Sequence, residues 1–286
     1  MLTHALSSEC RLEVAETKKR GHAVELARQA VADGYDAVVA LGGDGTVNEV
    51  VNGILTDGPR PGLPAVGVVP GGSTNVFARA LGLPNGAVEA TSELLAALHG
   101  DRRRTIGLGQ VDDRWFTFNA GMGLDGAAVR RVERSRAKGR TSTPALYVRS
   151  TVREFFLGLD RSHPALLLER PGAEPVELGL ALVCNTAPWT YAGDRPVSPC
   201  PDASFDTGLD VFGLRTLGTF GTLRHVPQIL SRRPRPRGRR VVALHDLPEF
   251  TLTSREPLPL QVDGDDLGDR TRIVLRSVPA ALEVLV

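Results

Sequence analysis

The sequence predicts an α/β protein of two domains, an open α/β domain followed by a β-rich domain. Before residue 104, an apolar strand pattern twice runs into a glycine-rich turn and then into a helical pattern. After residue 104, successive strand patterns replace this alternation of strand and helix. The length of 286 residues is enough for two modest hydrophobic cores. We therefore predict an α/β domain over residues 1–104 and a β-rich domain over residues 105–286.

Composition and charge exclude several classes of protein. The formal net charge is +1, so no global field draws the chain to nucleic acid, and we expect no nucleic-acid partner. The cysteines Cys10, Cys184 and Cys200 lie far apart, which argues against a disulfide framework and a zinc site and fits a reducing cytoplasm. No apolar run approaches the roughly 20 residues that span a bilayer. We expect a cytoplasmic protein.

The first strand–turn–helix unit contains the most informative stretch of the chain. Residues 36–41 are an apolar run that predicts a buried parallel strand, and apolar residues at helical spacing predict a helix from near Gly45. Between them, residues 42–46 read Gly-Gly-Asp-Gly-Thr. Glycine turns that open a helix bind phosphate, because the backbone approaches closely and the helix N-terminus offers N–H groups. Asp44 would repel a bare phosphate, so it fits a bound cation or a role as acid or base.

A simpler interpretation of this turn exists. Any strand-to-helix turn can use glycine as a stop and aspartate as a helix cap. The contiguity of the five residues, and the polar stripe of Asn48, Glu49 and Asn52 on the following helix, favour a functional turn.

A second unit of the same kind follows a loop at residues 57–63. Residues 64–69 predict a buried strand that runs into Pro70-Gly71-Gly72-Ser73-Thr74-Asn75 and then into another helical pattern. Ser73 and Thr74 could cap that helix, bind a phosphate, or do both.

These two stretches resemble motifs of the diacylglycerol kinase catalytic domain family. Residues 42–46 resemble its GGDGT signature, and residues 70–81 resemble its P-x-G-T-x-N-D-F-A-R motif, with Val76 where many relatives carry aspartate. NAD kinases and phosphofructokinases share the GGDG core. In NAD kinases, however, the later motifs lie much further downstream, so the short spacing between the two turns favours a lipid kinase.

The N-terminal region departs from the family pattern. Family members usually begin with a strand that closes in Asn-Pro beside the nucleotide, and we find no such strand here. Residues 11–16 predict a short strand, and apolar residues at helical spacing from Ala23 to Val31 predict a helix that ends at Gly34. A parallel sheet without its first strand exposes backbone donors and acceptors, so we expect lower stability or a homodimer formed through that edge.

The remaining patterns predict a mainly β domain. We expect a helix over 87–99, a hairpin of strands 105–111 and 115–119 across Asp112-Asp113, helices over 145–157 and 219–231, and strands over 166–168, 176–185, 241–245, 250–253, 258–262, 272–276 and 281–286.

Four stretches of this region also resemble family motifs. Residues 118–126 resemble N-x-A-x-G-x-D-A, where Asp125 could be a helix cap or a polar contact between domains. Residues 184–196 resemble a loop at which the second domain meets lipid, and residues 204–210 resemble A-x-x-x-D-G-x-L-D. Residues 263–265, Asp-Gly-Asp, resemble a D-G-E/D motif that reaches back to the active site, although Asp-Gly is also an ordinary hairpin turn.

The resemblance implies an NAD kinase- and phosphofructokinase-like first domain, a second domain built as a β-rich sandwich, and an active site in the cleft between them. It implies transfer of the γ-phosphoryl group of ATP, with Mg²⁺, to a lipid hydroxyl such as that of diacylglycerol. The expected nucleotide contacts are Gly42, Gly43, Gly45, Thr46, Asn48, Glu49, Gly71, Gly72, Ser73, Thr74 and Asn75. The candidate catalytic acids are Asp44, Asp263 and Asp265, which the sequence does not rank, and the candidate metal ligands are Asp44 and Asp206.

The sequence leaves alternative functions open, and it also suggests a membrane partner. The rivals are a kinase for NAD or a sphingoid base, and a non-catalytic nucleotide- or lipid-binding member of the family. Residues 231–240 form a basic, proline-broken run that is either simply solvated or meets anionic phospholipid at roughly 1 kcal/mol per arginine. We therefore expect a lipid substrate at the membrane surface and a peripheral protein.

Overall fold

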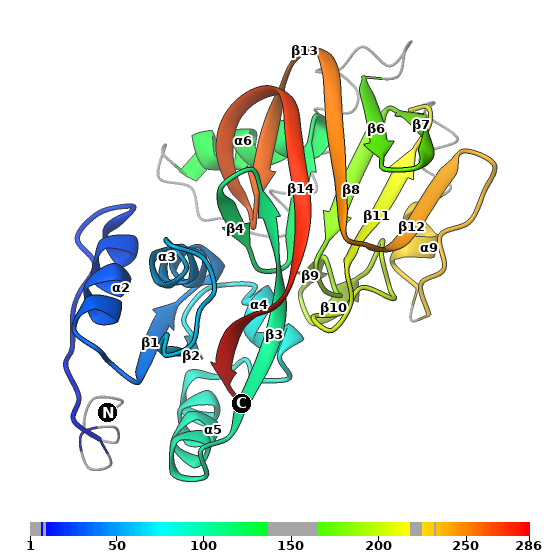
Figure 1. Ribbon diagram of the computed structural model, residues 1–286. Coiled ribbons are helices and arrows are strands. Elements are labelled where there is room, and N and C mark those ends of the chain that lie inside the picture. Colours follow the sequence, from blue (N-terminus) through cyan, green and yellow to red (C-terminus); the bar gives the residue numbers. More distant parts are fainter. Residues whose placement is uncertain (1–6, 8–9, 137–164, 218–224, 232) are drawn as a thin grey trace. The chain divides into compact units, whose positions relative to one another are not determined.

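The computed structural model describes residues 7, 10–136, 165–217, 225–231 and 233–286 (Figure 1). The chain forms two compact units, Met1–Gly107 with Ala280–Val286, and Leu108–Pro279. A mixed α/β unit and a strand-rich unit confirm the predicted fold class. The helix expected over 145–157, and residues 219–224 of the one expected over 219–231, lie outside the described residues.

Unit 1 is built around two parallel strands. Its elements are α2 (His22–Ala32), β1 (Ala37–Gly42), α3 (Asp44–Ile54), β2 (Ala65–Pro70), α4 (Val76–Ala80) and α5 (Ala87–His99). These confirm the helix predicted from Ala23 to Gly34, the helix predicted over 87–99 and both strand–turn–helix units. Strand β1 pairs with β2 from Ala37↔Ala65 to Gly42↔Pro70. The carboxyl ends of both strands therefore meet at one edge of the sheet, and both glycine turns leave from that edge.

Strand β1 is less buried than the sequence predicts. Of its residues only Ala40 is fully buried, and Leu41 is 59% exposed. Within the described residues, β1 pairs with β2 alone, so one side of β1 has no strand neighbour to cover it. The strand predicted over residues 11–16 is wrong: residues 11–18 are mostly exposed chain without strand pairing. Dimerisation through the β1 edge stays a prediction.

Two long strands belong to both units. Strand β3 (Arg103–Val111) leads from unit 1 into unit 2, and β14 (Asp265–Leu285) leads back. Val284 of β14 pairs in parallel with Val66 of β2, and the side chains of Ala281, Leu282, Val284 and Leu285 are buried. The last residues of the chain therefore complete the core of unit 1, which a single boundary near residue 104 does not foresee.

Unit 2 is largely antiparallel. Its further elements are β4 (Arg114–Phe116), β5 (Asn119–Met122), α6 (Leu124–Arg136), β6 (Leu166–Arg170), β7 (Ala173–Leu178), β8 (Leu180–Cys184), β9 (Thr190–Ala192), β10 (Arg195–Val197), β11 (Leu209–Leu214), α9 (Val226–Ile229), β12 (Val241–Leu247) and β13 (Glu249–Val262). The main sheet runs β14-β13-β5-β8-β11-β12, while β9 and β10 form a separate hairpin. The β3–β4 hairpin is confirmed.

Three strand predictions for unit 2 are corrected. The strand predicted over 176–185 is two strands, β7 and β8, separated at Gly179. The strands predicted over 250–253 and 258–262 are one strand, β13, because the polar residues between Thr253 and Leu258 form a register shift and not a chain end. The strands predicted over 272–276 and 281–286 are likewise parts of β14.

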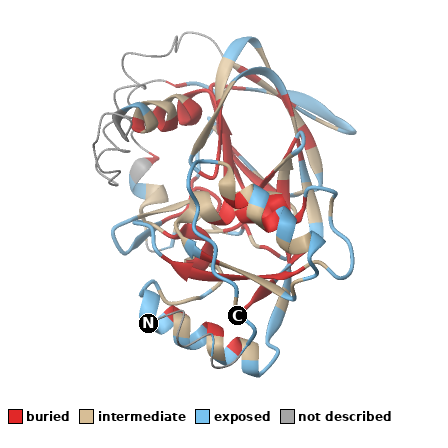
Figure 2. Ribbon diagram, turned by 90° about the vertical axis from the view of Figure 1, so that its left-hand side faces the viewer, coloured by how far each residue is buried: buried red, intermediate tan, exposed pale blue. Residues whose placement is uncertain are grey.

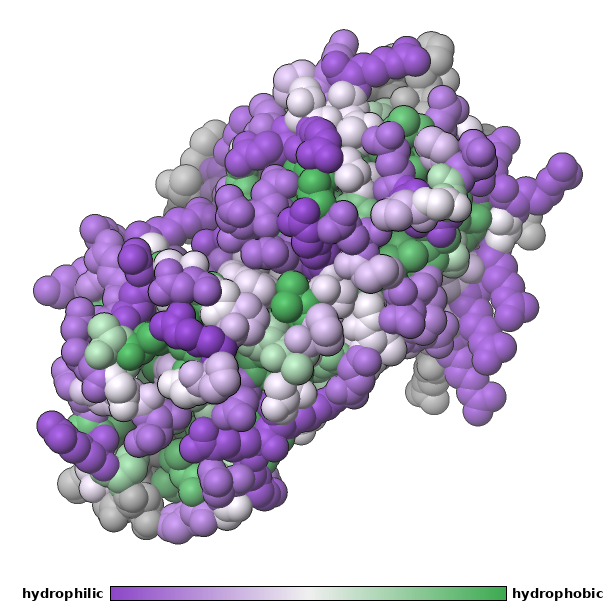
Figure 3. All heavy atoms as spheres, in the orientation of Figure 1, coloured by the Kyte–Doolittle hydropathy of each residue, from purple (hydrophilic) through white to green (hydrophobic). Residues whose placement is uncertain are grey.

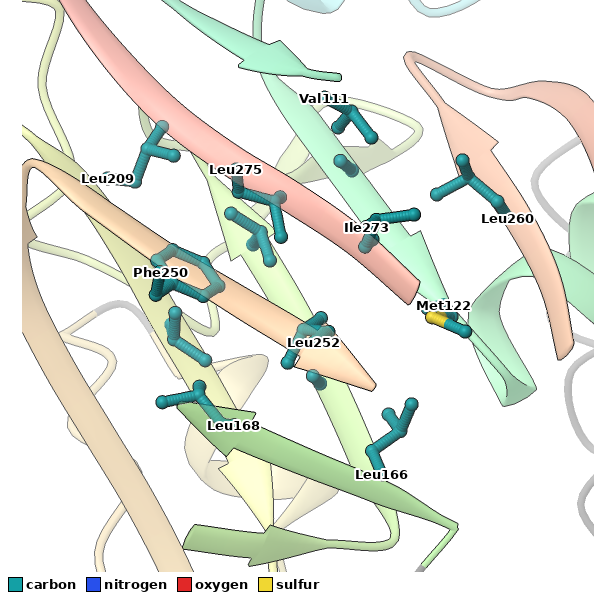
Figure 4. Close-up of a cluster of buried hydrophobic side chains, with 14 of the residues drawn as sticks. Val111, Met122, Leu166, Leu168, Leu209, Phe250, Leu252, Leu260, Ile273 and Leu275 are labelled. Carbon is teal, nitrogen blue, oxygen red and sulfur yellow. The ribbon is translucent and has the colours of Figure 1, made fainter. Parts of the chain in front are cut away.

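The core of unit 2 is an apolar cluster contributed by several strands. Phe250 and Leu252 of β13, Ile273 and Leu275 of β14 and Leu168 of β6 are all buried in it (Figure 4). Buried residues lie on the central strands and on one face of helices such as α3, whereas loops and strand ends are mostly exposed (Figure 2). This core fixes the ends of β5 and β13, where the polar groups described below lie.

Candidate active site

The two glycine turns of unit 1 touch through their backbones. The N–H of Gly71 donates to the carbonyl of Gly42 at 2.9 Å. A Cβ on Gly72 would lie 2.7 Å from the Cα of Gly43, which is closer than real Cβ atoms approach. A Cβ on Gly71 would lie 3.2 Å from the Cα of Gly42. Glycine is therefore required here by close backbone approach, and the structure brings these four predicted contact residues together.

Asp44 braces the two turns. Its Oδ2 accepts a hydrogen bond from the N–H of Val76, and its Oδ1 accepts one from the N–H of Phe77, both at 3.0 Å. These N–H groups open α4 and have no partner within that helix. A carboxylate at a helix N-terminus is favoured by charge as well as by hydrogen bonding. Asp44 thus caps α4 across the sheet edge, a role that the sequence alone did not indicate.

Asn75 closes the second turn. It adopts a left-handed conformation with φ 50°, which asparagine tolerates better than most residues. Its Oδ1 accepts the N–H of Gly72 at 2.9 Å, and its Nδ2 donates to the carbonyl of Gly72 at 3.0 Å and to Asn85 Oδ1 at 2.8 Å. The Asn75 side chain is therefore a structural element of the predicted phosphate turn.

The predicted contacts Asn48 and Glu49 also have structural partners. The Glu49 carboxylate accepts the N–H of Gly21 at 2.8 Å and that of Ala23 at 3.2 Å, so it caps α2. Asn48 is fully buried, and its Oδ1 accepts a hydrogen bond from Asn52 at 3.1 Å. Their contact with a nucleotide stays a prediction.

Four other positions of the turns, Gly45, Thr46, Ser73 and Thr74, are not fully buried by the packing of the chain itself. A Cβ on Gly45 would meet nothing within 4 Å, so the packing of the chain itself does not require glycine there. Ser73 is exposed and Thr74 partly exposed, and neither provides the observed cap of α4, which comes from Asp44. Thr46 Oγ1 would lie 2.7 Å from a Cβ on Gly42, which places this hydroxyl over the first turn. Hydroxyls and an open helix start are the groups that a phosphate binds.

In unit 2, the carboxylate of Asp263 is bound by hydrogen-bond donors of residues 117–119. Its carboxylate accepts hydrogen bonds from the N–H and Oγ1 of Thr117 at 2.7 and 2.8 Å, and from the N–H groups of Phe118 and Asn119 at 3.0 Å. Asp263 and Gly264, with φ of 49° and 84°, form the two-residue turn between β13 and β14. Burial raises the pKa of the Asp263 carboxyl, and the four donated bonds oppose that rise. Asp263 therefore anchors a hairpin, whereas Asp265 follows it at the partly buried start of β14.

A buried polar network surrounds this hairpin. Gln261, only 1% exposed, donates to Asn119 Oδ1 at 2.8 Å and to Asp125 Oδ2 at 2.6 Å, and accepts the N–H of Gly264 at 2.9 Å. The carboxylate of Asp125 in the first turn of α6 thus makes a polar contact within unit 2. Sequence reasoning missed Gln261 and Thr117; the signal for Gln261 is a polar residue inside an apolar strand pattern.

Arg130 of α6 forms ion pairs with two aspartates of β14, just after the β13–β14 turn. Its Nε and Nη2 donate to Asp266 at 2.7 and 3.0 Å, and its Nη1 lies 2.8 Å from Asp269 Oδ1. Burial alone would raise the pKa of Asp266, but the hydrogen bonds and charge of Arg130 outweigh it and hold that pKa below 3.8.

We expect Arg130→Gln to reduce the acid sensitivity of unit 2. A lowered carboxylate pKa contributes stability that is present above the unfolded value and is lost as the pH falls through the folded value. Wild-type stability should therefore decline below about pH 4, and the variant should lose about 1 kcal/mol at pH 7 with a flatter acid decline. Urea unfolding followed by circular dichroism across pH measures both. The control is Arg276→Gln, which breaks an exposed pair with Glu249; equal pH profiles for the two variants would contradict the assignment.

The described residues do not by themselves form a metal site. No group of three or more histidine, cysteine, aspartate or glutamate side chains among them has a metal-binding arrangement. Asp44 lies in unit 1, and Asp206 is an exposed residue before β11 in unit 2. The buried carboxylate of that motif is Asp210, which lies 2.7 Å from His245 Nδ1. Asp44 and Asp206 as Mg²⁺ ligands stay predictions.

The fold is that of two-domain kinases of known structure. A putative diacylglycerol kinase from Bacillus anthracis str. Sterne superimposes with a TM-score of 0.76 at 18% identity, over 98% of this chain and 88% of that one. An NAD kinase from Archaeoglobus fulgidus, solved in complex with ATP, superimposes with a TM-score of 0.52 at 10% identity, over 100% of this chain and 88% of that one. These similarities show that the chain shares a two-domain α/β fold with these proteins.

Sequence comparison finds one family model that matches the first part of the chain. Residues 2–111 match the diacylglycerol kinase catalytic domain. A diacylglycerol kinase of Bacillus subtilis is 41% identical over 103 residues, which cover 36% of this chain and only about a third, 32%, of that protein. One of Staphylococcus aureus (strain bovine RF122 / ET3-1) is 28% identical over 253 residues, covering 87% of this chain and 74% of that protein. The chain is therefore similar to the diacylglycerol kinase catalytic domain over residues 2–111, and to a diacylglycerol kinase over most of its length.

Proposed function

We propose that this protein is an ATP-dependent lipid kinase that phosphorylates the hydroxyl of diacylglycerol or a related lipid. The observation that carries the proposal is the pair of glycine turns, locked by the Gly71–Gly42 hydrogen bond and by Asp44, beside an open Gly45. The match of residues 2–111 to the family model and the names of the relatives support a kinase.

The chain's own residues would act mainly by positioning. Phosphoryl transfer requires phosphates held in line with the acceptor and charge stabilisation, with little covalent chemistry from the protein. Gly45, Thr46, Ser73 and Thr74 line the open positions of the turns, where N–H and hydroxyl donors would hold the phosphates of ATP. Mg²⁺, which commonly arrives with the nucleotide, would neutralise phosphate charge there. Asp265 is the remaining unit 2 candidate for the group that takes the hydroxyl proton.

We expect Ser73→Asp to raise the KM for ATP about tenfold or more, because it puts a negative charge where we place a phosphate. The matched control is Ser92→Asp, the same substitution on the exposed face of α5 in the same unit. The assay is transfer of labelled phosphate from ATP to a panel of diacylglycerol, sphingosine and NAD.

Each rival function has its own outcome in that panel. Transfer to NAD or sphingosine alone would replace diacylglycerol as the acceptor. Binding of ATP without transfer to any acceptor would favour a non-catalytic family member. An unchanged KM in Ser73→Asp would remove the second turn from the proposed phosphate site.

A further inference from the structure

A basic surface lies on unit 2, formed by arginines of the proline-broken run of residues 231–240 and by the neighbouring Arg195. We call it the arginine surface; its described members are Arg195, Arg233, Arg235, Arg237, Arg239 and Arg240. All of these side chains belong to exposed residues. Residues 231–240 contain six arginines and no acidic residue, in a chain whose net charge is only +1. The positive charge is therefore local to this part of the molecule.

The loop that carries these arginines is anchored to the unit. Pro236 is buried. The N–H of Arg237 donates to Gln228 Oε1 of the α9 segment at 2.7 Å, and the N–H of Arg215 donates to the carbonyl of Arg240 at 2.9 Å. The N–H of Val241 donates to the carbonyl of Gly238 at 3.0 Å. The loop thus presents its side chains from a fixed backbone, and the prolines keep it from forming a helix.

The β9–β10 hairpin lies beside this loop. The Arg195 guanidinium donates to the carbonyl of Leu230, and the N–H of Ser198 donates to that of Ile229 at 3.4 Å. Trp189, Ile229 and Val241 pack against one apolar cluster. The segment whose sequence resembles a lipid-contacting loop and the arginine run therefore meet on one side of unit 2.

Some arginines elsewhere in the chain are paired with acidic side chains. Arg103, Arg130 and Arg276 each form an ion pair with a carboxylate. Among the described residues, no ion pair joins a member of the arginine surface to an acidic side chain. On the face drawn in Figure 3, hydrophilic residues predominate and apolar residues form only small groups. Uncompensated guanidinium groups are suited to bind phosphate from outside the chain.

We propose that the arginine surface docks this protein on a bilayer that contains anionic phospholipid. The proposal rests on the proposed function, since the acceptor of a lipid kinase is embedded in a membrane. No helix among the described residues is long and apolar enough to cross one. Each arginine near an anionic surface contributes about 1 kcal/mol, and the attraction fades as salt shortens the Debye length below about 10 Å.

The test is co-sedimentation of the full chain with phosphatidylcholine vesicles, with and without phosphatidylserine, across a salt series. The variant changes Arg233, Arg235, Arg237, Arg239 and Arg240 to Gln. The control changes five exposed arginines elsewhere, Arg28, Arg60, Arg255, Arg270 and Arg272, to Gln, so that net charge is matched. We expect affinity for anionic vesicles to fall about tenfold or more in the variant and to stay within about twofold in the control.

A second readout separates docking from catalysis. Phosphate transfer to a short-chain, water-dispersed diacylglycerol should be unchanged in the variant, while transfer to diacylglycerol in anionic vesicles should fall. Wild-type protein that binds anionic vesicles but transfers no phosphate would contradict the proposed function and leave the docking surface standing. Equal vesicle binding by variant and wild type, or binding of wild type to RNA but not to vesicles, would overturn the docking surface.

Discussion

Asp44→Asn is expected to lower turnover by about a hundredfold or more, equivalent to about 3 kcal/mol of barrier. It is also expected to lower the free energy of unfolding of unit 1 by about 1–3 kcal/mol. The carboxylate accepts the N–H groups of Val76 and Phe77. An amide keeps one acceptor oxygen, but its NH₂ group would face the other N–H. One of the two hydrogen bonds by which residue 44 links the two glycine turns would then be lost.

The kinetic constants decide what Asp44 does. A raised KM for ATP with a nearly unchanged kcat would identify a positioning residue, whereas a fall in kcat at unchanged KM would favour a metal or proton role. Urea unfolding and steady-state phosphate transfer give the two sets of values. The control is Asp57→Asn, a carboxylate paired with Arg60 at the surface and 76% exposed. A folded Asp44→Asn protein with normal turnover and stability would contradict both roles.

Asp263→Asn should be the most destabilising change in unit 2, at about 3–5 kcal/mol. Four donors converge on this buried carboxylate. With asparagine, the donors facing its NH₂ group would be buried without an acceptor. We expect the thermal unfolding of this variant to lose its cooperativity. Its activity should be lost as well, because the variant no longer folds.

Asp265→Asn is the matched comparison, one residue beyond Gly264. If Asp265 takes the hydroxyl proton, this variant should keep its melting temperature and lose turnover about a hundredfold. Differential scanning calorimetry and phosphate transfer measure the two effects. An Asp263→Asn protein as stable as the wild type would contradict the anchoring role, and normal turnover in Asp265→Asn would remove it as the base.

Local patterns predicted most of unit 1. Glycines, apolar periodicity and the change of pattern near residue 104 are properties of neighbouring residues, and they sufficed to find both turns, helix α5 and the fold class. The same patterns misplaced the strand over residues 11–16, because a short alternation of apolar and polar residues does not say whether a partner strand is present.

The roles of the acids could not be predicted in this way. Asp44 meets its partners across 32 and 33 residues of chain, and Asp263 meets Thr117 across 146. A sequence motif shows that a carboxylate is there but not which donors the fold will bring to it. The same holds for Gln261, whose partners Asn119 and Asp125 lie on β5 and α6.

The path of β14 has a consequence for the order of folding. Residues 280–286 supply buried side chains and a strand pairing to unit 1, although everything from Leu108 to Pro279 belongs to unit 2. Synthesis proceeds from the N-terminus, and domains generally fold as units during it. On the ribosome, the sheet that carries the glycine turns therefore has to wait for residues 280–286, with the β14 side of β2 uncovered. Unit 2 has all of its own strands earlier, so unit 1, which carries the glycine turns, should be the later unit to mature.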